Sequence, residues 1–171
     1  MFLLLLSSLI SYSMSMTMVE LPAGVMVNEA KSIVNGKVEA VNYEKTSNMI
    51  YTNYTFKINT DGYIKSGDIN SDTINIRTIG GQVGREKLDV PGFPILSQNG
   101  EYALFLEKRG NNYDIYGANQ GCLKVTKESN GDKILSPCEN EYANSIYVNQ
   151  ASSGKVTLKG FIKKIQGYQT N

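Results

Sequence analysis

The sequence predicts a mainly β protein: a small OB-like β-barrel or a curved antiparallel sheet, with a short N-terminal helix and a C-terminal helix. Three observations support this fold class. Apolar and polar residues alternate in several short stretches, glycines and prolines separate those stretches, and helical spacing occurs only near the two ends. Hydrophobic residues make up 41% and charged residues 19% of the 171 residues, as is usual for a globular domain.

The N-terminus has the pattern of a secretory leader. Phe2 to Ile10 is an apolar run of the length found in signal-peptide cores, and the serines at 11, 13 and 15 suit a cleavage site. We therefore expect a signal peptide at 1–15 and a single β-rich domain at 16–171. An uncleaved N-terminal anchor is the alternative. Five serines and a threonine interrupt the first 19 residues, so no stable membrane span is expected after leader cleavage.

The remaining elements follow in order along the chain. A short helix is expected at 21–32, and strands at 33–43, 49–58, 73–79, 85–90, 101–108 and 113–116. In 49–58 the even-numbered residues, from Ile50 to Ile58, alternate with polar ones and are predicted to face the core. The run 101–108 is apolar on both faces, which indicates a strand buried on both sides. Gly80-Gly81 separates 73–79 from 85–90, and the two are predicted to form a hairpin.

The two cysteines belong to a second predicted hairpin. Ser129-Asn130-Gly131 fits a three-residue turn with Gly131 in the left-handed position. With this turn, each residue of the first strand lies opposite the residue of the second strand for which the two residue numbers sum to 260. Cys122 then lies opposite Cys138, close enough for a disulfide, while Leu123 and Leu135 share the other face. An exported chain with two cysteines favours the bridge over two free thiols.

The C-terminal helix is predicted from apolar spacing after Thr157, a suitable N-cap residue. Leu158, Phe161, Ile162 and Ile165 recur at i, i+3, i+4 and i+7. Gly167 is expected to end the helix, which places Lys163 and Lys164 in its last turn.

The composition excludes several kinds of chemistry. Without any histidine the chain lacks the usual general base and the commonest zinc ligand, so Ser-His-Asp and Cys-His sites are excluded. The net charge is +1 and no basic patch is present, which argues against nucleic-acid binding. No catalytic residue, cofactor-binding residue or metal ligand is predicted, and the protein is interpreted as non-enzymatic.

The chain from Val34 to Val125 resembles a group of uncharacterised bacterial secreted proteins with a β domain. The matching pieces, in order, are GKV at 36–38, IYTNYTF at 50–56, GGQVG at 80–84, VPGFP at 90–94, GEYALFL at 100–106 and QG at 120–121. The resemblance implies export and a β domain but no particular reaction.

A more remote resemblance is to netrin-like domains and the tissue inhibitors of metalloproteinases, which are OB-like barrels. Those inhibitors place an N-terminal cysteine on the catalytic zinc of a protease. This chain has no cysteine before Cys122, so the resemblance does not extend to that mechanism.

The sequence thus favours a secreted or periplasmic module that binds a protein or peptide without catalysis. The predicted contact surface comprises Gly80, Gly81, Arg85 and Phe93, because the glycine-rich turn and the VPGFP segment interrupt the strands. Two alternatives stay open. One is a structural or assembly component of the cell envelope, and the other is a hydrolase that uses serine, lysine or carboxylates.

Overall fold

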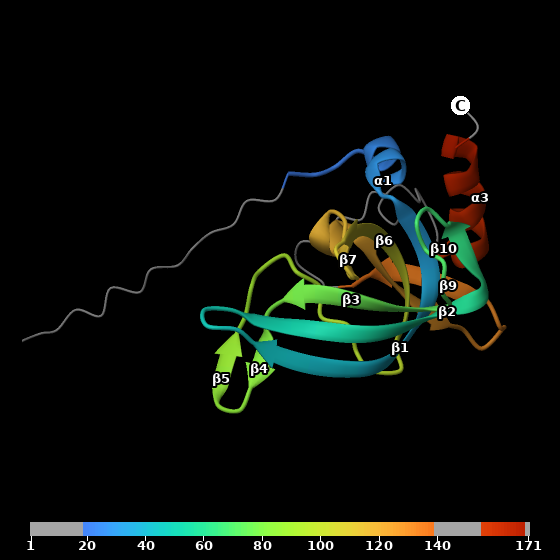
Figure 1. Cartoon of the computed structure of the whole chain (residues 1–171). Coiled ribbons are helices and arrows are strands. Elements are labelled where there is room, and N and C mark those ends of the chain that lie inside the picture. The colour runs from blue at the N-terminus through green and yellow to red at the C-terminus, as the bar shows by residue number, and fades with distance from the viewer. Residues whose placement is uncertain (1–18, 139–154, 170–171) are drawn as a thin grey trace, which may run out of the picture.

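The computed structural model describes residues 19–138 and 155–169 (Figure 1), so the predicted signal peptide at 1–15 lies outside the described residues. The mainly β fold with a curved sheet and a helix near each end is confirmed. The elements are α1 (Ala23–Glu29), β1 (Ser32–Lys45), β2 (Ile50–Lys65), β3 (Thr73–Ile79), β4 (Gly81–Val83), β5 (Glu86–Leu88), β6 (Glu101–Arg109), β7 (Asn112–Ile115), η1 (Ala118–Gly121), β8 (Cys122–Lys127), β9 (Lys133–Pro137), β10 (Val156–Thr157) and α3 (Leu158–Gln169).

Five strands form a closed ring of hydrogen-bonded pairs, in the order β1-β2-β3-β7-β6 and back to β1. Five is also the number of strands in an OB-like barrel. The pairing of β3 with β7, through Ile76 and Tyr113, is parallel, and the other pairs are antiparallel. The first half of β6 also pairs with β8, which continues the sheet into β9 and β10.

The sheet has a core on each face. The ring encloses one core, which includes Tyr54, Phe56 and Leu104. The second core lies between the sheet and the two helices, and it includes Met26, Phe105 and Phe161. Strand β6 contributes alternate residues to both cores, which confirms that it is buried on both sides. In β2 the five even-numbered positions from 50 to 58 are buried, as their spacing predicted.

Helix α1 is shorter than the predicted range because the chain enters β1 at Ser32. Its carbonyl end is closed by the side chain of Lys65, whose Nζ donates to the carbonyl oxygens of Val27 at 2.9 Å, Asn28 at 3.1 Å and Ala30 at 2.7 Å. A cation at this end also opposes the negative pole of the helix dipole. The side chain of Lys65, a residue of β2, therefore attaches helix α1 to the sheet by bonding to backbone carbonyls at the end of the helix.

The prediction that 73–79 and 85–90 pair as a hairpin was wrong. Strand β3 pairs with β2 and β7, whereas β5 pairs with β4, which forms a separate two-stranded sheet around Gly84-Arg85. Gly84 has φ +60° at the first turn position, as a two-residue II′ turn requires. Proximity in sequence misled the prediction, because the short strand Gly81–Val83 begins at the second glycine of the pair and intervenes between the two predicted strands.

The second predicted hairpin is confirmed in detail. Strands β8 and β9 pair Leu123 with Pro137 and Val125 with Leu135, and Cys122 and Cys138 form a disulfide with their Cα atoms 5.6 Å apart. Gly131 has φ +91°.

The C-terminal helix is also confirmed, except at its end. The Thr157 hydroxyl caps it by accepting from the Gly160 N–H at 3.1 Å. The helix continues through Gly167 to Gln169, so Lys163 and Lys164 are not in its last turn. A glycine inside a helix costs only about 1 kcal/mol, which packing of Phe161 and Ile165 offsets.

Candidate functional site

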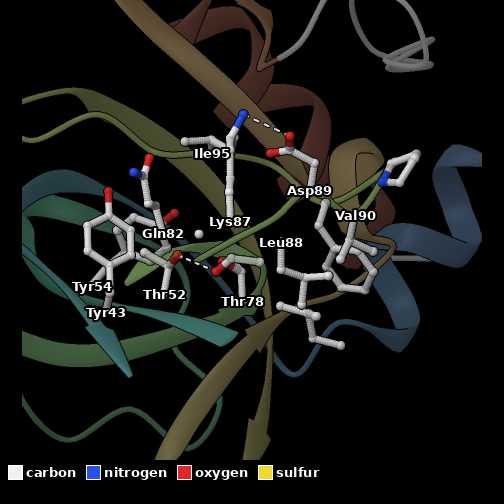
Figure 2. Close-up of a pocket in the computed structure, with 15 residues that line it drawn as sticks. Tyr43, Thr52, Tyr54, Thr78, Gln82, Lys87, Leu88, Asp89, Val90 and Ile95 are labelled. Atoms are coloured by element: carbon white, nitrogen blue, oxygen red, sulfur yellow. Dashed lines mark hydrogen bonds and ion pairs between the residues drawn. The ribbon is translucent and has the colours of Figure 1, made fainter. Parts of the chain in front are cut away.

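A pocket of about 380 Å³ lies where the β4–β5 hairpin folds across the ends of β1, β2 and β3 (Figure 2). We call it the apolar pocket. Figure 2 shows Tyr43 and Tyr54 on one side, Leu88 and Val90 on the other, and Thr52 and Thr78 between them. Its lining consists of Tyr43, Thr52, Tyr54, Thr78, Ile79, Gly80, Gly81, Gln82, Lys87, Leu88, Asp89, Val90, Pro91, Phe93 and Ile95.

The glycine pair sets the path of the chain into the hairpin. Gly80 and Gly81 have φ +110° and +126°, conformations that side chains disfavour. A Cβ on Gly81 would also lie 2.6 Å from Thr52 Oγ1 and 2.7 Å from Tyr43 Cδ1. Glycine at this position therefore lets the hairpin approach the sheet closely and form the wall of the apolar pocket.

The polar groups on the pocket floor form hydrogen bonds with other groups of the protein. Thr52 Oγ1 donates to the Gly80 carbonyl at 2.7 Å, and the Leu96 N–H donates to the Tyr54 hydroxyl at 3.3 Å. Tyr54 also hydrogen-bonds the Thr78 side chain, and burial raises the pKa of its hydroxyl. A floor whose hydroxyls are already engaged favours an apolar group, because a polar ligand would gain few new hydrogen bonds there.

The rim of the apolar pocket carries unusually exposed apolar side chains. Ile95 is 67% exposed and Tyr43 is 52% exposed, although both are large. Beside them, Lys87 and Asp89 form an ion pair at 2.7 Å. The mouth of the apolar pocket therefore combines two exposed apolar side chains with one ion pair.

A second pocket, of about 390 Å³, is also lined by Phe93, and we call it the polar pocket. It shares the lining residues Thr78, Ile79 and Phe93 with the apolar pocket, so the two pockets are neighbours; we call the pair the groove and each pocket one of its lobes. Its remaining lining is Tyr51, Arg77, Glu107, Arg109, Asp114, Ile115 and Ala118.

Paired charges dominate the polar pocket. Arg77 lies 3.8 Å above the Tyr51 ring centre and donates to Glu44 at 3.1 Å. Arg109 contacts Asp114 at 2.7 Å and Glu107 at 3.5 Å. Burial raises the pKa of the Asp114 carboxyl, and the Arg109 charge opposes that rise. Arg77 Nε is buried and has no hydrogen-bond acceptor among the described residues. Four charged side chains thus line this lobe together with the apolar groups of Ile79, Phe93 and Ile115.

The structure brings together three of the four predicted contact residues. Gly80, Gly81 and Phe93 line the apolar pocket, and Phe93 lines the second pocket as well. Arg85 instead lies in the exposed turn of the β4–β5 hairpin and is not part of either lining. It extends the candidate surface from the groove to the hairpin tip.

The sequence interpretation missed the charged residues of the polar pocket. Glu107 and Asp114 are direct partners across the β6–β7 hairpin, and Arg109 follows on the same face of β6. A signal was present, because Gly110-Asn111 between two apolar-rich runs is a hairpin turn, and its register places these carboxylates opposite each other. Arg77 was harder to find, since its position depends on the pairing of β3 with β2.

No family model, curated protein or solved structure compared with this chain matches it. Neither α1 nor α3, the α-helices of the described residues, has the length and apolar character of a membrane-spanning helix. Within residues 19–138 and 155–169, no group of three or more acidic or cysteine side chains is arranged to hold a metal ion.

Proposed function

We propose that this protein is a non-catalytic binding module that holds a peptide segment of a partner protein in its two-lobed groove. The observation that supports this most directly is the apolar pocket, whose floor hydroxyls are engaged internally while Ile95 and Tyr43 remain exposed at its mouth. Burial of an apolar side chain there would remove apolar surface from water on both partners. The pocket volume of about 380 Å³ is within the usual range for ligand sites.

The proposal places the protein outside the cytoplasm, secreted or in the periplasm. A disulfide between Cys122 and Cys138 supports this location, because cytoplasmic thiols are kept reduced. The apolar run at Phe2 to Ile10 supports it as well.

The test begins with a displayed library of random linear peptides, panned against the full chain with its disulfide intact. An enriched peptide is then synthesised and its affinity is measured by calorimetry. The variant Phe93→Ser/Ile95→Asp is expected to bind it at least about tenfold more weakly, since it removes apolar contacts worth about 1.4 kcal/mol or more. The variant Arg85→Ala/Phe93→Ala tests the contact surface predicted from sequence and is also expected to bind more weakly.

The matched control is Val19→Asp, which changes another exposed apolar residue, 77% exposed, outside both lobes. It should leave the affinity unchanged. Failure to enrich any peptide, or equal affinity of the groove variants and the control, would refute the proposal. Capture on envelope fractions without peptide binding would then favour the structural alternative.

A further inference from the structure

Strand β5 has a free edge beside the apolar pocket. Among the described residues β5 pairs only with β4, and Figure 1 shows β5 as the outer strand of that hairpin. The partners across the two-residue turn are Val83 and Glu86. In such a hairpin this pair exchanges hydrogen bonds, and the next residue points its N–H and carbonyl away from the partner strand. The backbone groups of Lys87 therefore face the outer edge.

The strand that carries this free edge also lines the apolar pocket. Lys87, Leu88 and Asp89 all line the apolar pocket, and the opposite edge of the hairpin, on β4, lies toward β1 and β2. An extended chain paired with β5 would pass the pocket mouth, and every second side chain would face the same side. One such side chain would then be positioned to enter the apolar pocket.

The side chains along the outer edge of β5 determine what kind of peptide can pair with it. Glu86 pairs with Lys45 at 2.6 Å and Lys87 pairs with Asp89 at 2.7 Å, so the edge is charged but locally neutral. Charged edges discourage indiscriminate strand pairing. An occupant must therefore gain its affinity from the adjacent pocket as well as from backbone hydrogen bonds.

We propose that the partner segment binds as an added β-strand on the outer edge of β5, with a large apolar side chain in the apolar pocket. This inference rests on the proposed function and specifies its geometry. Backbone hydrogen bonds to Lys87 provide sequence-independent affinity, and the pocket selects the apolar residue, which is the usual division of roles in strand addition.

The deciding experiment compares two substitutions at one position. Lys87→Pro removes the outward N–H, and proline is tolerated on edge strands where the N–H faces solvent. Lys87→Ala removes the same charge but keeps the N–H. The probe is the synthetic peptide enriched from the random library. The proline variant is expected to bind it about tenfold more weakly than the alanine variant, as loss of one intermolecular hydrogen bond predicts.

A second measurement uses the wild-type protein, so it does not depend on how the proline variant folds. N-methylation of the peptide at successive backbone positions should weaken binding at every second position, because only alternate N–H groups face β5. An effect without this alternation, or equal affinity of the proline and alanine variants, overturns strand addition. The groove variants would still weaken binding in that case, and the proposed function would stand. A dimer of the full chain that Lys87→Pro dissociates would assign the edge to a second copy and overturn the inference.

Discussion

Tyr54 illustrates how a single side chain serves both the core and the candidate site. It is 1% exposed and its ring packs inside the five-stranded ring, while its hydroxyl reaches the floor of the apolar pocket. There it accepts the Leu96 N–H at 3.3 Å and thereby anchors the segment that follows Phe93. The same contact that closes the pocket floor thus positions the exposed rim residue Ile95.

The buried hydroxyl of Tyr54 predicts a loss of stability in alkali. Burial raises its pKa above the ordinary 10.0, so the neutral form is favoured in the folded state. The free energy of unfolding that the neutral hydroxyl contributes is fully present below pH 10.0, and it is lost as the pH rises through the pKa of the folded state. We expect the unfolding free energy of the wild type to fall more steeply above that pH than that of Tyr54→Phe. Urea titrations across the alkaline range measure both slopes, and parallel slopes would contradict the assignment.

At the scale of the element, the β8–β9 hairpin combines a turn, a register and a covalent link. Its disulfide joins residues 16 apart in sequence, and Cys122 faces the ring core while Leu123 faces the helices. The link holds the end of β9 to the start of β8, and β10 pairs with β9 nearer the turn to complete the sheet. The hairpin therefore supports helix α3, which begins directly after β10.

Reduction of the disulfide is expected to lower the unfolding free energy by roughly 3 kcal/mol, because the unfolded chain regains the freedom of that loop. The measurement is urea unfolding of the wild type with and without a reductant. The control is Cys122→Ala/Cys138→Ala, whose stability the reductant should not change. An unchanged stability of the reduced wild type would show that packing alone maintains the hairpin.

At the scale of the whole molecule, β6 couples the two cores. Its alternate residues reach the ring core and the helix-covered core, and it pairs with β1, β7 and β8. Neither core can lose its packing without disturbing this strand. The β4–β5 hairpin, which forms a wall of the apolar pocket, lies at the opposite end of the strands from α3 (Figure 1), so α3 stabilises the scaffold without covering that pocket.

This coupling predicts one cooperative unfolding transition. Phe161→Ala in the helix-covered core and Phe56→Ala in the ring core should each cost about 3–5 kcal/mol, as truncation of a buried phenylalanine usually does. Far-ultraviolet circular dichroism, which follows the backbone, and tyrosine fluorescence, which follows tertiary packing around the tyrosines, should give coincident transitions in both variants. Separate transitions in Phe161→Ala would mean that the helices unfold independently of the ring.

Much of the fold was predictable because it depends on local pattern. Alternation placed the even-numbered residues of β2 in the core, continuous apolarity placed β6 between two layers, and the turn at Ser129-Asn130-Gly131 fixed the cysteine pairing. Thr157 and the spacing after it likewise located α3. Each of these inferences needs only residues near one another in the chain.

The candidate site depended on tertiary structure. The sequence alone predicted three residues of this site, Gly80, Gly81 and Phe93, because glycine and proline interrupt strands locally. Only the folded chain placed them against Tyr43 and Thr52 of distant strands, separated β4–β5 from the main sheet and brought Arg77 to the pocket that Asp114 lines. The physical reason is that strand pairing between distant segments follows from closing the ring and burying both faces of β6, which no local pattern encodes.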